Sequence, residues 1–366
     1  MRLLLLSRVF PPAVGGMERF AEQLAGWLSV RGHEVTVATQ TAAEPEADRD
    51  RPYRVLRGPS PGALGRALRR AEAAHVNGLS ARGVAAAVAA GRTPVTTHAG
   101  HQAICPTGLA WSERGVCDAG PRPGPCAACP GRGPIGTVDV GLHRSAARIS
   151  RRNVCVSRYL ERRLVPPRSE AIYNPVSEKA MTSRERRRGE DGLIAFSGRL
   201  VAEKGLHLLL RALPQLPATR LEVAGDGPLR SAAERLAASL GVRNRVRFVG
   251  SLPFEKLAEL YVRSSVVCAP SAWGEPFGYS AAEAMAMGRA VVATPRGALP
   301  ELLGGGRGFL AAGADPDALA AALEAALSDA GSLREAGERA ARFADRELRL
   351  DVIGPRYESL YREAAR

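Results

Sequence analysis

The sequence predicts an α/β protein made of two doubly wound domains in tandem. Strand-like and helix-like segments alternate along all 366 residues, and this alternation favours mostly parallel sheets covered by helices. A chain of this length with 45% apolar residues is long enough for two hydrophobic cores. A segment rich in proline and charge near the middle of the chain separates the two series of elements.

The first domain is predicted over residues 1–170. An apolar run at 3–6 predicts a buried strand, an apolar face at positions 20, 21, 24 and 28 predicts a helix, and alternation at 34–38 predicts a second strand. Weaker strands are predicted at 74–77, 94–98 and 153–157, with a helix at 80–90. This order indicates βαβ units and a parallel sheet.

A linker is predicted over 171–191 and a second domain over 192–354. The predicted strands of this domain are 193–197, 220–224, 246–249, 265–269 and 290–294, and the helices are 205–213, 228–240, 255–262, 280–287 and 316–330. In open α/β sheets ligands bind outside the carboxyl ends of the strands. We therefore expect the chemistry in a cleft between two such domains.

The chain is strongly basic, with a formal net charge of +14. Only Lys179, Lys204 and Lys256 are lysines, so the positive charge is mostly arginine spread along the sequence. The arginine clusters lack the interleaved aromatic residues of a single-strand binder, so no nucleic-acid partner is expected. A peripheral contact with an anionic membrane and a merely solvated basic surface both stay open.

The N-terminal segment predicts a buried strand and not a targeting sequence. Its apolar run is four leucines long, which is too short for a signal peptide. No stretch approaches the roughly 18–20 apolar residues that a membrane span needs. We expect a cytoplasmic protein, with any membrane contact peripheral and at the inner face.

The most specific motif is Glu275-Pro276-Phe277-Gly278, followed by Glu283-Ala-Met-Ala. If a helix begins just after Gly278, Glu275 lies in the loop that enters it and Glu283 in its opening turns. Two carboxylates at one end of a helix can accept hydrogen bonds from the hydroxyls of a ribose or a sugar ring, and the free N–H groups at the helix start can hold a phosphate. The alternative is a surface glutamate and a second one that merely favours the helix dipole.

Two further loops contain groups that suit a diphosphate. Arg199 and Lys204 follow a predicted strand, where two cations can stabilise the charge on a departing diphosphate without a bound metal. Gly15-Gly16 lies between the first strand and its helix, where small residues let the backbone N–H groups approach anionic oxygen. Alone, the first pair could equally be surface cations and the second an ordinary turn.

These motifs together resemble the GT-B fold retaining glycosyltransferases of family 4. Their order and spacing match along nearly the whole chain: Gly15-Gly16, the loop from Arg199 to Lys204, Gly225-Asp-Gly-Pro, Pro270-Ser271 and the block from Glu275 to Gly288. The resemblance implies two Rossmann-like domains that face each other across a cleft. It also implies that a C-terminal helix over 355–365 crosses back to the first domain.

The resemblance also implies roles for individual residues. Arg199 and Lys204 would hold the donor diphosphate, which Gly16 also approaches, and Glu283 would bind the ribose hydroxyls. Glu275 and the Phe277-Gly278 backbone would contact the donor sugar, and His98 would touch that sugar near the reacting carbon. The catalytic set is then His98, Arg199, Lys204 and Glu275, and the donor-binding set is Gly15, Gly16, Arg199, Lys204, Gly225, Phe277, Gly278 and Glu283.

By this analogy the chain moves a sugar from a nucleotide-diphosphate sugar to an acceptor, with retention and without a catalytic metal. The acceptor would be a hydroxyl or other nucleophile of a glycan, a lipid-linked molecule or a small natural product. The leaving phosphate would help to deprotonate the acceptor on the same face of the sugar. A nucleotide-sugar epimerase of the same architecture and a non-catalytic nucleotide-sugar sensor remain as alternatives.

Four cysteines, Cys105, Cys117, Cys126 and Cys129, lie within one Gly/Pro-rich stretch of the first domain. In a protein expected in the cytoplasm, four thiols with a C-x2-C pair favour a structural zinc ion. An iron–sulfur cluster, a disulfide or redox role, and no ligand role stay open. Cys155 and Cys268 lie in apolar strands and are predicted to be core residues.

Overall fold

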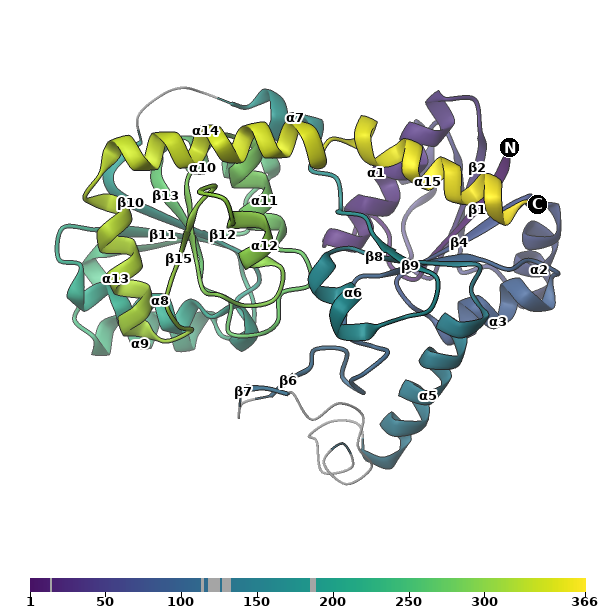
Figure 1. Ribbon diagram of the computed structural model, residues 1–366, viewed down its shortest axis with the longest axis horizontal. Coiled ribbons are helices and arrows are strands. Elements are labelled where there is room, and N and C mark those ends of the chain that lie inside the picture. The colour runs from purple at the N-terminus through teal and green to yellow at the C-terminus, as the bar shows by residue number, and fades with distance from the viewer. Residues whose placement is uncertain (14, 113–114, 118–125, 127–132, 185–188) are drawn as a thin grey trace. The chain divides into compact units, whose positions relative to one another are not determined.

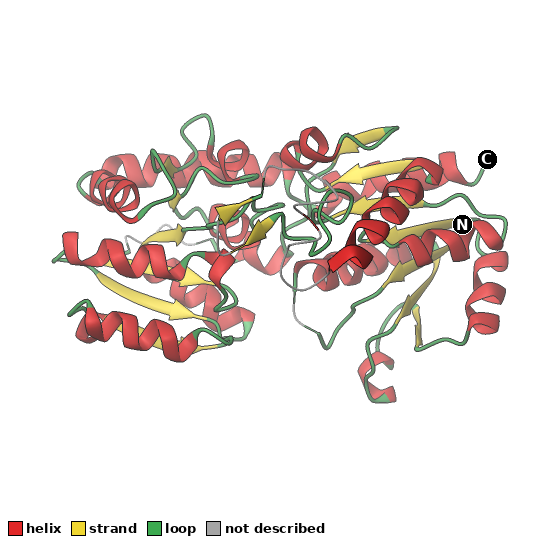
Figure 2. Cartoon of the chain, turned by 90° about the horizontal axis from the view of Figure 1, so that it is seen from below, coloured by secondary structure: helices red, strands yellow, loops and turns green. Residues whose placement is uncertain are grey.

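The computed structural model describes residues 1–13, 15–112, 115–117, 126, 133–184 and 189–366. The chain divides into two compact units. The first consists of Met1–Ala110, Cys117–Pro175 and Leu350–Arg366, and the second of Trp111–Val116 and Val176–Arg349. Within each unit, helices cover both faces of a sheet (Figures 1 and 2).

The first unit is built on a parallel sheet with the strand order β3-β2-β1-β4-β5-β8-β9. The chain therefore starts in the middle of the sheet and changes direction between β1 and β4, the place where a doubly wound sheet usually binds its ligand. The strands are β1 (Arg2–Ser7), β2 (Glu34–Thr39), β3 (Arg54–Arg57), β4 (Ala73–Asn77), β5 (Val95–His98), β8 (Arg152–Cys155) and β9 (Ser169–Ala171). The helices are α1 (Gly16–Val30), α2 (Pro61–Arg70), α3 (Ala81–Ala89), α5 (Gly133–Ile149), α6 (Arg158–Leu164) and α15 (Leu350–Ala364).

Side chains from α1 and α15 pack on one face of this sheet, and those from α2 and α3 on the other. On the first face Tyr361 Oη lies 2.8 Å from His75 Nδ1, and His75 Nε2 lies 2.7 Å from Thr97 Oγ1. His75 is fully buried, and burial lowers its pKa to about 3, so the ring is neutral and uses both nitrogens in hydrogen bonds. These bonds anchor the C-terminal helix to the sheet of the first unit.

The start predicted for the C-terminal helix was wrong. The helix begins at Leu350, Pro355 lies inside it, and residues 350–354 belong to the first unit and not to a second domain that ends at 354. Trp27 Nε1 donates a hydrogen bond to Asp351 Oδ1 at 3.0 Å, and Gly354 lies against the Trp27 ring. These contacts with α1 offset the helical hydrogen bond that a proline removes.

The second unit also has a parallel sheet, with the strand order β12-β11-β10-β13-β14-β15. Its strands are β10 (Glu190–Ser197), β11 (Arg220–Ala224), β12 (Val246–Gly250), β13 (Ser264–Ala269), β14 (Val291–Ala293) and β15 (Phe309–Leu310). Its helices are α7 (Glu178–Thr182), α8 (Leu206–Ala212), α9 (Arg230–Ser239), α10 (Phe254–Arg263), α11 (Tyr279–Ala286), α12 (Leu299–Leu303), α13 (Pro316–Leu327) and α14 (Ala330–Glu347). A separate antiparallel pair joins β6 (Trp111–Ser112) to β7 (Gly115–Val116).

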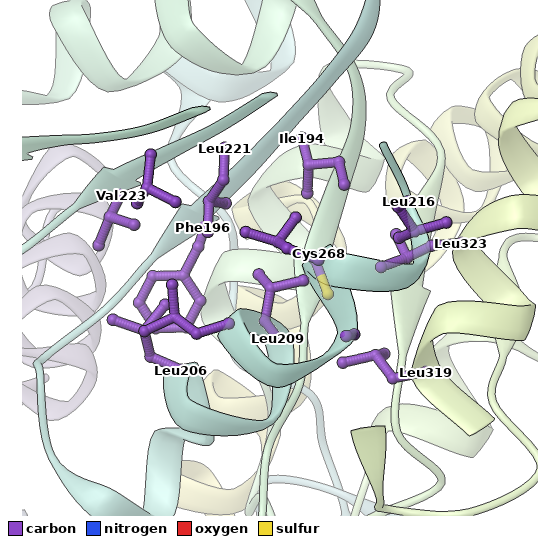
Figure 3. Packing of buried hydrophobic residues seen from close by; sticks show 14 of the residues in the cluster. Ile194, Phe196, Leu206, Leu209, Leu216, Leu221, Val223, Cys268, Leu319 and Leu323 are labelled. Carbon is purple, nitrogen blue, oxygen red and sulfur yellow. The ribbon is translucent and has the colours of Figure 1, made fainter. Parts of the chain in front are cut away.

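The core of the second unit lies between its sheet and the helices α8 and α13. Phe196, Leu209 and Cys268 belong to this cluster, in which Leu209 lies between the other two (Figure 3). Cys155 in the first unit and Cys268 in the second are both buried, which confirms that they are core residues. Burial raises the pKa of both thiols, so they are unreactive packing side chains.

Candidate active site

The motifs of the second unit follow its strands at one edge of the sheet. The Arg199–Lys204 loop follows β10, Gly225 follows β11, and the loop that carries Glu275 follows β13. Because all these strands are parallel, their carboxyl ends meet at the same edge. The chain changes direction between β10 and β13, so the loops that contain Lys204 and Glu275 are neighbours at the switch point.

Lys204 and Glu275 form an ion pair at this edge. Lys204 Nζ lies 3.0 Å from Glu275 Oε1 and 2.8 Å from Oε2, although the two residues are 71 positions apart in the sequence. The ammonium group also lies 5.5 Å from the centre of the Trp273 ring, within the range of a cation–π contact. The Lys204 side chain is 30% exposed and that of Glu275 is 9% exposed, so the lysine is the partner that solvent can reach.

Two further donors fix the carboxylate of Glu275. Ser271 Oγ and Trp273 Nε1 each donate a hydrogen bond to Oε2 at 3.1 Å. Burial raises the pKa of this carboxyl, but the charge and hydrogen bonds of Lys204, together with these two donors, outweigh burial and hold the pKa below its usual range. Glu275 is therefore ionised at neutral pH, and its position excludes the interpretation as a loop surface residue.

Helix α11 begins at Tyr279, directly after Gly278, as the sequence predicts. Gly278 has a φ of 93°, in the left-handed region that favours glycine. Phe277 is buried and its ring makes an edge contact with Tyr279 at 5.0 Å. Glu283 lies on this helix and is only 5% exposed, so both carboxylates of the motif are buried near the helix start.

The sequence interpretation missed two residues that shape this site. Gly297 has a φ of 65°, and a Cβ there would collide with the backbone N and O of Glu275. Trp273 was missed as a donor to the buried carboxylate. The signal in the sequence was weak: a tryptophan that directly precedes the glutamate motif, and a glycine in the loop that follows the next strand.

Arg199 and Gly225 lie at the same edge of the sheet. Arg199 is exposed, and in the described part of the chain its side chain has no hydrogen bond or ion pair. The N–H of Gly225 donates to Gly250 O at 2.7 Å. The edge thus presents one exposed guanidinium and one half-buried ammonium, the cation pair that a diphosphate would require.

The remaining predicted residues lie in the first unit. Gly15 caps α1 and Gly16 is its first residue, so the pair lies at the junction between the first strand and its helix, where the sequence predicts it. Gly15 is in an extended conformation that any residue can adopt, and the three described atoms nearest to a Cβ there would belong to the flexible carboxylate of Glu18. An anion at this helix start would therefore have to move the Glu18 side chain.

His98 ends β5 and is fully buried. Its Nε2 lies 2.8 Å from Asn153 Oδ1, while Asn153 Nδ2 donates to the carbonyls of Ala147 and Pro167 at 2.9 and 2.7 Å. Because the amide nitrogen is used by the carbonyls, His98 Nε2 carries the proton. Burial lowers the pKa of His98 to about 4, so the ring is neutral, and its buried Nδ1 has no partner among the described residues.

The predicted zinc site is only partly within the described residues. Cys105 and Cys126 are buried and Cys117 is partly exposed, whereas Cys129 lies outside the described residues. Within the described ranges no group of three or more His, Cys, Asp or Glu residues could hold a metal ion. In those same ranges no helix has the length and apolar character to cross a bilayer.

Comparison with known families matches both halves of the chain. The family described as "Glycosyltransferase Family 4" matches residues 14–179, and "Glycosyl transferases group 1" matches residues 178–343. The chain belongs to the family 4, group 1 glycosyltransferases. Its two doubly wound units are the halves of a GT-B fold.

Curated relatives match this chain over part of their length. It is 39% identical over 174 residues to a D-inositol 3-phosphate glycosyltransferase of Corynebacterium urealyticum, a match that covers 43% of this chain and 40% of the relative. It is 38% identical over 146 residues to an uncharacterised glycosyltransferase of Methanocaldococcus jannaschii, covering 39% and 37%. The matched stretches thus span less than half of these relatives.

Solved structures match the fold of this chain over almost its whole length. Anabaena HepE in complex with UDP gives a TM-score of 0.77 at 18% identity and covers 99% of this chain and 100% of that chain. Sucrose-phosphate synthase from Thermosynechococcus elongatus gives 0.76 at 20% identity and covers 99% and 98%. At these identities the likeness concerns the fold alone.

Proposed function

We propose that this chain transfers a sugar from a nucleotide-diphosphate donor to an acceptor nucleophile, with retention of anomeric configuration. The observation that carries the proposal is the Lys204–Glu275 pair at the start of α11, with the exposed Arg199 in a loop at the same edge of the sheet. Cations here would neutralise the diphosphate as the sugar–phosphate bond breaks, so the chemistry needs no metal. The complexes of HepE with UDP and UDP-glucose support a donor of this class.

In this proposal the ion pair holds Lys204 in position before the donor arrives. Glu275 is fixed by Ser271 and Trp273, so it restricts the lysine to one region at the loop edge. A diphosphate would then compete for the solvent-accessible ammonium group, while the Glu275 carboxylate would accept hydrogen bonds from sugar hydroxyls. Glu283 would accept those of the ribose.

His98 would contribute an acceptor and not a proton. Its neutral ring is held by Asn153, and the Nδ1 lone pair, which has no partner in the described part of the chain, would accept a hydrogen bond from a sugar hydroxyl. The acceptor would be a glycan, a lipid-linked molecule or a small natural product, and the leaving phosphate would take its proton. Peripheral contact with an anionic membrane and the structural zinc remain predictions, the latter testable by elemental analysis of the purified protein.

The experiment is thermal unfolding of the purified protein with a panel of nucleotide-diphosphate sugars. A ligand that binds only the folded state raises the unfolding midpoint, by an amount equivalent to about 2.7 kcal/mol at a concentration 100 times its Kd. We expect one donor to raise the midpoint, and Lys204→Ala to abolish that rise. Lys256→Ala is the matched control, since this lysine is exposed and, among the residues that the structure describes, its ion-pair partner is Glu259 on its own helix.

Product analysis with the selected donor then separates the alternatives. Transfer to an acceptor, or slow hydrolysis of the donor, supports the transferase, and the anomeric configuration of the product tests retention. Turnover of the donor to an epimer without any acceptor would replace the proposal with an epimerase. Binding with neither transfer nor hydrolysis would replace it with a sensor.

A further inference from the structure

A hollow lined by arginines lies on the first sheet at the amino ends of its strands. The expected ligand-binding side of this sheet is the opposite one, at the carboxyl ends. The hollow has a volume of about 180 Å³ and is bounded by β1, β2, β3 and α2. Arg2 opens β1, Glu34 opens β2 and Arg54 opens β3, so the hollow lies at the amino ends of these strands. It is separate from the motifs described above, which follow the carboxyl ends.

The strand register explains why these side chains converge. Arg2 is opposite Glu34, and Thr36 is opposite Arg54. Because side chains alternate along a strand, Arg2 and Leu4 share a face, as do Glu34 and Thr36 on the neighbouring strand. This is the face that α2 covers, since Leu4 packs in the same cluster as Leu68 of that helix.

Small residues on the helix leave the space open. Three alanines spaced four residues apart line the hollow: Ala63, Ala67 and the C-cap Ala71. Residues at this spacing lie on one face of the helix. Arg66 and Arg70 line the hollow from the same helix. The hollow is therefore lined by leucines, alanines and the Thr36 hydroxyl, with exposed guanidinium groups at its rim.

The charges around the hollow are not balanced by the protein. Four arginines and one glutamate line it: Arg2, Arg54, Arg66, Arg70 and Glu34. Arg2 has a carboxylate partner, at 3.7 Å from Glu72, whereas in the described ranges the side chains of the other three arginines have no hydrogen bond or ion pair.

Some other arginines of the same unit have a carboxylate partner. Arg57 pairs with Asp48, Arg152 with Glu363 and Arg356 with Glu170. Arg66 and Arg70 also repel each other, since like charges four residues apart destabilise a helix. An anion between the guanidinium groups would remove this repulsion and supply the missing hydrogen-bond acceptors.

We propose that this arginine-rimmed hollow binds a phosphate group. Its volume exceeds the roughly 30 Å³ share of one water molecule and is below the roughly 300–1,000 Å³ of sites for drug-sized ligands. It therefore suits the phosphate of a small ion or of a lipid headgroup, and not a whole nucleotide sugar. The site does not depend on the proposed transferase activity, because it shares no residue with the donor site.

The test compares two variants of the full chain that lose the same charge. Arg66→Ala/Arg70→Ala removes two rim residues of the hollow, whereas Arg69→Ala/Arg82→Ala removes two exposed arginines that do not line it. All four positions lie on helices where alanine is well tolerated, and circular dichroism checks that both variants fold. The probes are inorganic phosphate, by calorimetry at fixed ionic strength, and phosphatidylcholine vesicles with about one third phosphatidylglycerol, by flotation.

We expect Arg66→Ala/Arg70→Ala to weaken binding of at least one probe about tenfold or more, the effect of losing a charge-assisted hydrogen bond. The control variant should stay within about twofold of the wild type, because it keeps all the rim residues. An effect on inorganic phosphate alone would identify a soluble ligand, and an effect on vesicles alone a lipid headgroup. Equal losses in both variants, or no binding of either probe by the wild type, would overturn the proposal.

Discussion

Replacement of Lys204 by alanine should destabilise the second unit in a way that depends strongly on pH. In the wild type the carboxylate of Glu275 is buried and receives hydrogen bonds from Lys204, Ser271 and Trp273. The substitution removes the counter-charge and leaves the two neutral donors. The buried carboxylate then lacks its main compensation for the loss of water.

The expected cost at neutral pH is about 2 kcal/mol. Removal of one partner from a fully buried ion pair costs about 3–5 kcal/mol. The cost here should be smaller, because the Lys204 side chain is 30% exposed and the hydrogen bonds from Ser271 and Trp273 survive. Loss of a fully exposed ion pair would cost at most about 1 kcal/mol, so the measured value also reports how well the Lys204–Glu275 pair is shielded from solvent.

The sign of the pH dependence follows from the pKa of Glu275. In the wild type this pKa lies below its usual range, so the carboxylate stabilises the fold above the pKa of the unfolded chain, and this contribution is lost as the pH falls through the folded value. Without Lys204, burial dominates and the pKa rises above its usual value. The variant is then penalised at neutral pH. Its deficit relative to the wild type should begin to shrink as the pH falls through the raised pKa of the variant, and should shrink further as the pH falls through the lowered pKa of the wild type.

The assay is urea unfolding of the wild type and Lys204→Ala at pH 7 and at several lower values. Glu275→Gln, alone and combined with Lys204→Ala, completes a double-mutant cycle that isolates the coupling between the two residues. We expect the double variant to be less destabilised than the sum of the single ones. A deficit that stays constant as the pH is lowered would refute the reasoning, because the lost interaction would then not involve an ionised carboxylate.

Three other predictions follow from the structure. Gly297→Ala should cost more than about 3 kcal/mol in unfolding free energy, because a Cβ there meets backbone atoms. Gly241→Ala is the control: this glycine has a φ of 70° and open space around it, so the substitution should cost about 1–2 kcal/mol. Equal costs for the two variants would contradict the close approach at Gly297. Tyr361→Phe should cost about 1–3 kcal/mol in chemical unfolding, because it leaves the buried Nδ1 of His75 without a partner, and a neutral effect would refute this. In NMR titrations of the folded protein, His98 should titrate near its lowered pKa of about 4, and a midpoint near 6.5 would contradict its burial. Because the unfolded chain takes up this proton near pH 6.5, the free energy of unfolding should fall progressively as the pH is lowered below 6.5.

Local sequence predicted much of the fold, and contacts between distant segments account for most of what it missed. The start of α11 after Gly278 was predicted because a turn glycine and an apolar helix are adjacent in sequence. Strand β3 (Arg54–Arg57) was missed because it is short, has an arginine at each end and contains no fully buried residue. Strand β15 was missed because it has only two residues and is defined by pairing with β14.

The candidate site shows the same limit more sharply. The sequence assigned Lys204 and Glu275 to one functional site by their motifs, yet it gave no sign that they pair with each other across 71 positions. That pairing depends on the strand order, which makes β10 and β13 neighbours. The close approach of Gly297 likewise arises only when β14 joins the same sheet.

The two proposed anion sites differ in what builds them, and this difference is measurable. The donor site depends on backbone geometry, because Gly278 and Gly297 allow the loop around Glu275 to form and an added Cβ would disturb it. The arginine-rimmed hollow depends on side-chain charge, because its helix and strands are regular and only its rim is unusual. Donor affinity should therefore be lost on substitution of a glycine that leaves the net charge unchanged. Phosphate binding at the hollow should survive that substitution and respond to the removal of Arg66 and Arg70.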